Sequence, residues 1–465
     1  MRKRINVKRS VACALVFGLW MPALALGPFD VDFNREIGVV KRLNGVCNAA
    51  PISYTQDSGI EERVKDLEIP FYRFHDAALE NPGYSLVDVS RIFPLFHLDP
   101  DDPKNYRFKE TDDYIRGCVE SGAKIDFRLG ESIEHARSWY RILPPTDFAK
   151  WAEICAHIVR HYNCGWADGY EWNIQYWSIW EEPDNQELLK GEDAYRKIYF
   201  PLYETTAKRL KSEFPNIKVG GPNCMGPWER PKAFIDYCHE HKAPLDFLSW
   251  TLYCRNNDSW VTCLRWWRRY LDSLGMTNTE IFVSEWHFGP VSWQGHGCVT
   301  DKAKAVEWHR ELTDIPAVAY TAETLIRLQD EPVDAMFFYS MNLSSWGLFD
   351  GDREPVGHYY AMKAFAALAH GSVRVCAPLV PERNWSLLAS KDGNGKGYVL
   401  LVARHADGIP KLALRGCEKP VSVKVVDSLS KLGEVRDWDW KDGVLTIPRH
   451  CSDSAIWLVE VELAH

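Results

Sequence analysis

A regular alternation of short apolar runs with longer amphipathic segments is the feature that most constrains the fold of this chain. It extends from about Gly38 to His370, and in segments such as 145–161 the apolar residues recur at helical spacing. The eight strand candidates are 45–49, 71–75, 124–129, 176–180, 217–220, 247–253, 281–286 and 335–340. Eight strand–helix units over this length predict a (β/α)8 barrel.

A doubly wound sheet would produce the same alternation, but no glycine-rich loop follows the first strand, as dinucleotide-binding sheets require. The pattern changes after the predicted barrel, residues 38–370. Residues 371–465 contain short strands separated by turn residues, which predicts a small β-sandwich. Residues 26–37 alternate apolar and acidic side chains, and we expect them to form a strand that joins the sandwich.

The first 25 residues have the pattern of a secretory signal peptide. Basic residues precede the apolar run 11–19, and Ala23-Leu24-Ala25 is a small-residue cleavage site. We therefore expect a secreted or periplasmic protein. No later apolar run is long enough to cross a membrane, so no membrane association is predicted.

Composition narrows the range of partners. The formal net charge of −9 disfavours nucleic acid and anionic lipid. Twenty tryptophans offer indole faces that suit both protein cores and the C–H faces of sugar rings. The cysteines show no Cys-x-x-Cys pair, and His157 and His161 lack a metalloprotease signature and are expected to be a surface pair. We predict no metal and no cofactor; the sequence leaves the oligomeric state open.

Two glutamates stand where predicted strands end. The fourth strand runs into Trp180-Glu181-Glu182-Pro183-Asp184, and the seventh ends at Ser284-Glu285-Trp286. In a (β/α)8 barrel, chemistry occurs at the carboxyl ends of the strands, and strands four and seven lie across the barrel mouth from each other. Burial beside indoles raises the pKa of a carboxyl group, so one glutamate can remain protonated while the other is ionised.

Such a pair suits cleavage of a glycosidic bond. One carboxyl group protonates the leaving oxygen, and the other either attacks the anomeric carbon or activates water. A separation of about 5 Å leads to retention of configuration, whereas about 6.5–9.5 Å leads to inversion. The sequence alone leaves both outcomes open.

Several motifs resemble glycoside hydrolase family 39, a clan A family that includes β-xylosidases and α-L-iduronidases. They are the two strand ends above together with Tyr72-Arg73-Phe74-His75, Gly220-Gly221-Pro222, Asp246-Phe247-Leu248-Ser249 and Gly357-His358-Tyr359-Tyr360-Ala361-Met362-Lys363. The resemblance implies a retaining, exo-acting, β-xylosidase-like hydrolase of plant or algal oligosaccharides or glycosides. It makes Glu182 the acid/base and Glu285 the nucleophile.

The same resemblance suggests substrate-site residues. Arg73 would lie near the nucleophile, His75 would contact the sugar, and Tyr253 would donate a hydrogen bond to Glu285. Trp286, His287 and Trp346 would wall the sugar site.

Two positions depart from the family pattern. Glu181 replaces an asparagine that binds the sugar 2-hydroxyl, and Thr251 replaces a histidine. Both departures keep two alternatives open, namely a non-catalytic carbohydrate-binding barrel and an endo-acting or inverting polysaccharide hydrolase. Arg128, near a strand end, is a candidate partner for the carboxylate of a uronic acid substrate.

Overall fold

The computed structural model describes residues 27–48, 59–75, 86–133, 143–184, 194–289, 302–341 and 343–464. The predicted signal peptide lies outside these residues. Within them, no helix combines the length and the apolar character that crossing a membrane requires.

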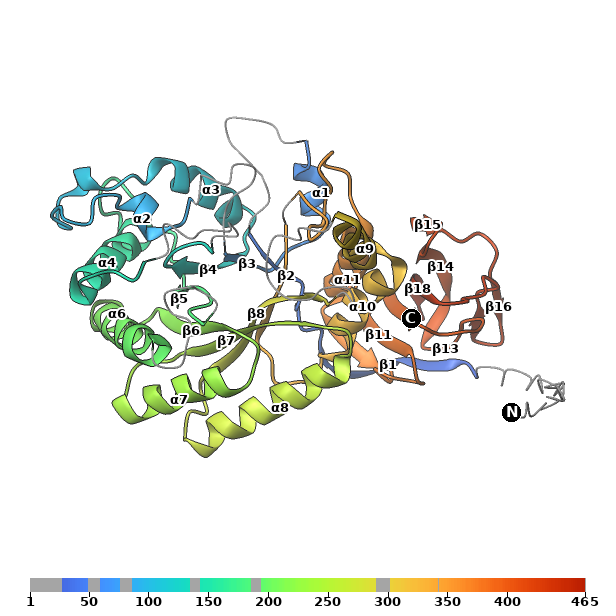
Figure 1. Cartoon of the computed structure of the whole chain (residues 1–465). Coiled ribbons are helices and arrows are strands. Elements are labelled where there is room, and N and C mark those ends of the chain that lie inside the picture. Colours follow the sequence, from blue (N-terminus) through green and yellow to red (C-terminus); the bar gives the residue numbers. More distant parts are fainter. Residues whose placement is uncertain are drawn as a thin grey trace, which may run out of the picture.

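Eight parallel strands close into a barrel, as the alternation predicts (Figure 1). They are β2 (Gly45–Cys47), β3 (Phe71–Phe74), β4 (Lys124–Leu129), β5 (Tyr176–Ile179), β6 (Lys218–Met225), β7 (Phe247–Cys254), β8 (Glu280–Phe288) and β9 (Ala335–Phe338). Each strand pairs with the next in the sequence, and β2 pairs with β9 to complete the ring. Strand order and direction therefore follow the simplest (β/α)8 path.

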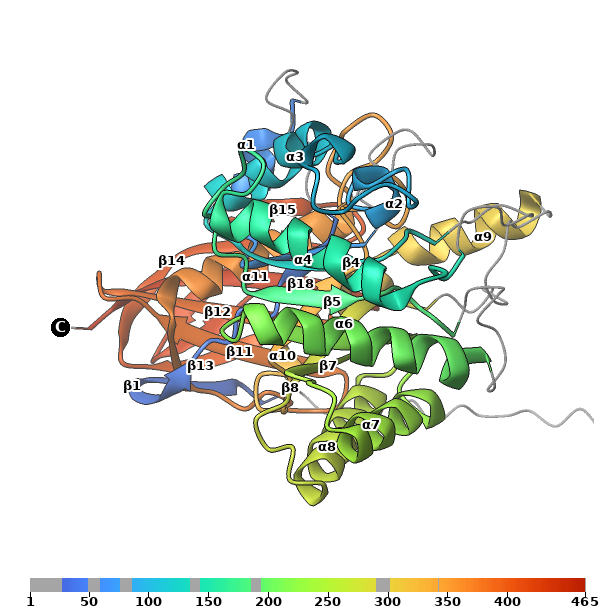
Figure 2. The same ribbon diagram turned by 90° about the vertical axis from the view of Figure 1, so that its left-hand side faces the viewer.

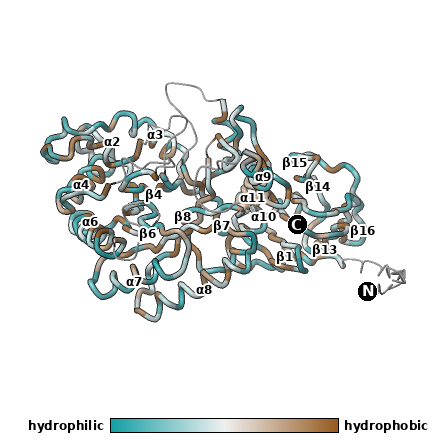
Figure 3. The backbone as a smooth tube through the Cα atoms, in the orientation of Figure 1, coloured by the Kyte–Doolittle hydropathy of each residue, from teal (hydrophilic) through white to brown (hydrophobic). Residues whose placement is uncertain are grey.

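Helices surround this ring (Figures 1 and 2). They are α1 (Glu61–Lys65), α2 (Val89–Ile92), α3 (Lys109–Glu120), α4 (Phe148–Cys164), α6 (Phe200–Glu213), α7 (Glu229–His241), α8 (Asn257–Ser273), α9 (Lys302–Thr313), α10 (Ile315–Arg327) and α11 (Gly357–Gly371). In Figure 3, α4 and α6 show both hydrophobic and hydrophilic segments, as amphipathic helices do. Helices α9 and α10 are separated at Asp314, because Pro316 favours a new helix start.

Aromatic side chains fill the amino end of the barrel. Phe71, Tyr176, Phe247, Phe282 and Phe337 belong to one buried cluster, with ring centroids as close as 4.6 Å. Side chains two positions further along a strand point to the same side. This aromatic layer therefore lies below a second inward-facing layer, which is polar, and it separates the carboxyl-end site from the amino end.

The remaining strands form a C-terminal mixed sheet of ten strands that is separate from the barrel. They are β1 (Phe29–Val39), β10 (Val373–Cys376), β11 (Trp385–Lys391), β12 (Lys396–Arg404), β13 (Lys411–Arg415), β14 (Cys417–Val426), β15 (Lys431–Glu434), β16 (Asp439–Lys441), β17 (Val444–Thr446) and β18 (Ser454–Leu463). One hydrophobic core takes side chains from strands near both ends of this sheet, including Val425 and Leu445.

The sheet packs directly against the barrel. On β11, Leu387 belongs to the core of the sheet, whereas the next residue, Leu388, belongs to the barrel cluster. This two-residue alternation gives the sheet one face toward α10 and α11. Strand β1 lies between β10 and β13, so the beginning of the described chain is held within the C-terminal sheet.

Candidate active site

Strand β3 carries two polar side chains above the aromatic layer. Arg73 and His75 follow Phe71 at two-residue spacing, so all three point into the barrel. Arg73 is completely buried, and its guanidinium contacts carboxylates from three other strands or strand ends: Glu181, Glu285 and Asp126. A buried guanidinium requires such partners, because an isolated charge inside a protein is very costly.

Glu285 reaches the same place from β8 with the help of an irregularity. Phe282 and Glu285 both point inward, although strict alternation would put residues three apart on opposite faces. The pairing of β8 with β9 shifts register between Val283 and Trp286. A bulge of this kind re-aims the side chains that follow it.

Three side chains bind the Glu285 carboxyl group. His75 Nε2 lies 2.7 Å from Oε1, Tyr253 donates its hydroxyl to Oε2 at 2.7 Å, and Arg73 Nη1 lies 3.4 Å from Oε1. Burial acts to raise the pKa of Glu285, but His75, Arg73 and Tyr253 together outweigh it and hold this pKa below its usual value. Glu285 is therefore ionised, as a carboxylate nucleophile must be.

The turn after β5 brings Glu181 and Glu182 to the barrel mouth. Trp180 and Glu182 have positive φ angles of 73° and 31°, which are uncommon for residues other than glycine. The turn directs Glu181 inward to an ion pair with Arg73, whereas Trp180 packs against Trp151 of α4.

Glu182 has a different environment from its neighbour. It is 3% exposed, and Thr251 donates its hydroxyl to Oε1 at 3.2 Å. Burial raises the pKa of Glu182 well above its usual value, and the negative charges of Glu285, Glu181 and Asp184 raise it further. Glu182 therefore keeps its proton at pH values where an ordinary glutamate has lost it.

The two adjacent glutamates differ in their contact with Arg73. Burial also raises the pKa of Glu181, but Arg73 and, less strongly, His75 oppose the shift. At Glu182, His75 also lowers the pKa, but by less than any of the three neighbouring carboxylates raises it. Thr251, one of the two departures from the family pattern, supplies a hydroxyl to Glu182, not a positive charge. Glu182 is therefore the better proton donor of the two.

His75, Glu181 and Glu285 have ligand atoms within 4.8 Å of one another, a spacing that could hold a metal ion. Arg73 already forms ion pairs with both carboxylates, however. A guanidinium in this position repels a cation, so the residues do not suit a metal centre.

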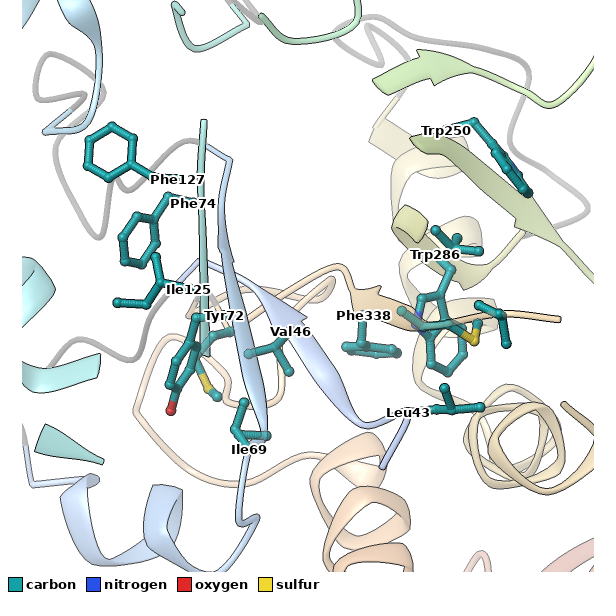
Figure 4. Packing of buried hydrophobic residues seen from close by; sticks show 14 of the residues in the cluster. Leu43, Val46, Ile69, Tyr72, Phe74, Ile125, Phe127, Trp250, Trp286 and Phe338 are labelled. Atoms are coloured by element: carbon teal, nitrogen blue, oxygen red, sulfur yellow. The ribbon is translucent and has the colours of Figure 1, made fainter. Parts of the chain in front are cut away.

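The three residues expected to wall the sugar site lie in different places. Trp346 is half-buried and packs near Tyr253, with ring centroids 5.5 Å apart. His287 lies behind it, fully buried, 5.2 Å from the Trp346 ring. Trp286 is a correction: its ring is fully buried in the hydrophobic layer outside the strand, 5.3 Å from Phe338 (Figure 4), and does not face the carboxylates.

Two residues of the site were not anticipated. Tyr339, directly after β9, has its ring 5.4 Å from that of His75 and 6.2 Å from that of Trp346. Asp126 of β4 lies beneath Arg73, and burial raises its pKa to about 6. Asp126 lies within a barrel strand and Tyr339 directly after one, both on the inward-facing side. This alternation is the signal that could have identified them.

Arg128 is fully buried, and one of its amino groups donates to Asp88 Oδ1 and to the His75 carbonyl, each at 2.6 Å. Its role toward a substrate carboxylate stays a prediction. The expectation for the two helical histidines requires correction. His157 and His161 are also buried, not exposed. They pack with Trp166 and nearby rings of the α4 region.

A cavity of about 1050 Å³ opens at the amino end of the barrel. It is lined by charged side chains that include Glu61, Lys65, Glu120 and Lys124. Phe71 of the aromatic layer also lines it, so the cavity lies on the opposite side of that layer from Glu182 and Glu285.

A (β/α)8 barrel with two glutamates of opposite pKa shift at its carboxyl end is the arrangement of the barrel glycoside hydrolases. Comparison with known proteins agrees with this class. Residues 83–264 match glycosyl hydrolases family 39. Together with the relatives below, this match supports membership of the chain in that family.

Two relatives are β-xylosidases. That of Geobacillus stearothermophilus is 35% identical over 111 residues, which cover 23% of this chain and 21% of the relative. That of Caldicellulosiruptor saccharolyticus is 26% identical over 235 residues, 47% of this chain and 44% of the relative. The matched regions thus span less than half of either relative.

Among solved structures, that of a glucosidase from Croceicoccus marinus is similar to this chain. It is 21% identical with a TM-score of 0.76, and the match covers 94% of this chain and 99% of that chain. At this level of identity the likeness concerns the fold.

Proposed function

We propose that the protein is a retaining, exo-acting glycoside hydrolase that removes a terminal sugar, in the manner of a β-xylosidase. One observation carries the proposal: two carboxyl groups at the same end of one barrel have pKa values shifted in opposite directions. Such a pair supports the assignment of one acid and one nucleophile. The β-xylosidase relatives support the choice of sugar.

In the proposed reaction, Glu285 attacks the anomeric carbon and forms a glycosyl ester. Glu182 gives its proton to the departing oxygen as the glycosidic bond breaks. Glu182, now ionised, then accepts a proton from water, which attacks the anomeric carbon and releases the sugar and the Glu285 carboxylate. Arg73, His75 and Tyr253 keep Glu285 ionised and fixed in orientation between turnovers.

The test uses aryl β-xylosides and aryl β-glucosides with the full chain. We expect hydrolysis, faster for the β-xylosides than for the β-glucosides, with the β-anomer of the released sugar appearing first in a time course by NMR. Glu285→Gln should lower kcat/KM by roughly 10⁴-fold or more, because the covalent step loses its nucleophile. Initial release of the α-anomer would refute retention, and binding of xylo-oligosaccharides without cleavage would favour a carbohydrate-binding barrel.

We also propose that the mature protein acts outside the cytoplasm, on the basis of the leader pattern in residues 1–25. Amino-terminal sequencing of the protein recovered from cell fractions tests this directly. A mature chain that begins near Leu26, recovered from the medium or periplasm, is expected; an intact leader on cytoplasmic protein would contradict it.

A further inference from the structure

Trp228, at the start of α7, is unusual because its indole is exposed. Seven of the largest fully buried side chains in the described part of the chain are tryptophans, whereas Trp228 is 58% exposed. It is also the only aromatic residue among the exposed large hydrophobic side chains of that part. An indole in water retains an apolar face that a ligand ring can cover.

Hydrogen bonds connect the segment that carries Trp228 to the turn that carries Glu182. Met225 donates its backbone N–H to Asp184 Oδ1 at 3.1 Å. On the other side of Trp228, Arg230 donates to the carbonyl and to Oδ2 of Asp184, each at 3.0 Å. Asp184 is two residues beyond Glu182, so Trp228 lies between two anchors to the proton donor's own turn.

A second link leads to Glu182 itself. Gly226 donates its backbone N–H to the carbonyl of Thr251 at 2.9 Å, and the Thr251 hydroxyl contacts Glu182. The segment follows β6 at its carboxyl end, which is the end of the barrel that carries the carboxyl groups. Trp228 therefore belongs to the rim on the side of Glu182, whereas Glu285 is reached from β8.

The side of the barrel mouth on which a rim residue lies determines which half of the substrate it meets. A general acid touches the leaving oxygen, so groups around it face the leaving group, and groups around the nucleophile face the sugar that is retained. We propose that Trp228 is the binding platform for the departing sugar ring, which would stack a C–H face on the indole. This inference rests on the proposed function and adds that the preferred leaving group is a sugar, as in a disaccharide or longer oligosaccharide.

The test compares two substrates that share the retained sugar but differ in the leaving group. Xylobiose places a sugar ring on the leaving side, and β-xylosyl fluoride places a single atom there. Trp228→Ala in the full chain should lower kcat/KM for xylobiose about tenfold, and should leave kcat/KM for the fluoride within about twofold of wild type. Trp228→Tyr should recover most of the loss, because a ring is restored.

Trp440→Ala is the matched control, since Trp440 lies on the edge strand β16 of the C-terminal sheet. Trp440→Ala should leave kcat/KM unchanged for both substrates. A second readout is the partition of the glycosyl-enzyme between water and added xylose: Trp228→Ala should lower the yield of transfer product. An equal loss of kcat/KM on both substrates, or no loss on xylobiose, would refute the proposed role of Trp228. If wild type cleaves neither substrate, the proposed xylosidase function falls, and this inference falls with it.

Discussion

Removing one hydroxyl group from the site should change the pH dependence of the reaction by a predictable amount. Tyr253 of β7 donates to Glu285 Oε2 at 2.7 Å, and burial raises the pKa of Tyr253 well above its usual value, so it remains a donor. A hydrogen bond to a charged group contributes about 1.5–3 kcal/mol. One pKa unit corresponds to about 1.4 kcal/mol, so Tyr253→Phe should raise the pKa of Glu285 by about 1–2 units.

The sign follows from the role of Glu285. Its ionised form is the active one, so activity is lost as pH falls through its pKa, and a higher pKa moves this acid limb toward neutral pH. The assay is the pH profile of kcat/KM for an aryl xyloside with a good leaving group. Tyr203→Phe is the control, because that buried hydroxyl donates to the Pro244 carbonyl at 2.8 Å, away from the carboxylates. An acid limb unmoved by Tyr253→Phe would refute the reasoning.

Three further predictions concern the same cluster. Glu182→Gln should lower kcat/KM about 10²–10⁴-fold for a disaccharide and far less for an aryl glycoside with an acidic leaving group, and equal losses on the two substrates would argue against Glu182 as the acid. The wild-type profile should be bell-shaped, because Glu285 must be ionised and Glu182 protonated; its alkaline limb should lie well above pH 4.5, and a limb near that value would contradict the raised pKa of Glu182. Arg73→Met leaves buried carboxylates without their cation and should destabilise the fold by about 3–5 kcal/mol in urea denaturation; Arg63→Met, which removes an exposed ion pair, should cost no more than about 1 kcal/mol, and similar losses for both would refute the claim.

The barrel was predictable from the sequence because its signal is local. Each strand is a short apolar run that ends at a turn, and each helix shows its own periodicity, so the eight units can be counted without knowing how they pack. The Glu182 and Glu285 positions could be singled out for the same reason, since strand ends of a barrel meet at one face. The strand order in the C-terminal sheet was not predictable, because strand pairing over long sequence distances decides it.

The orientation of individual site residues depended on details that the pattern does not contain. The register shift in β8 directs Glu285 inward and places Trp286 among hydrophobic side chains, opposite to the expectation for Trp286. Arg128 has the charge to bind a uronate, but its pairing with Asp88 depends on a contact between distant segments. Glu181 departs from the family pattern, and the structure pairs its carboxylate with the buried guanidinium of Arg73.

Covalent labelling of the nucleophile tests the central claim most directly. A 2-deoxy-2-fluoro-β-xyloside with a good leaving group should form a glycosyl-enzyme that hydrolyses slowly, because the fluorine destabilises the positive charge that develops in the transition state. Mass spectrometry of the digested protein should then find one added sugar on the peptide that contains Glu285. A label on Glu181 or Glu182 would contradict the assignment of roles, and inversion of configuration without any label would contradict the double displacement itself.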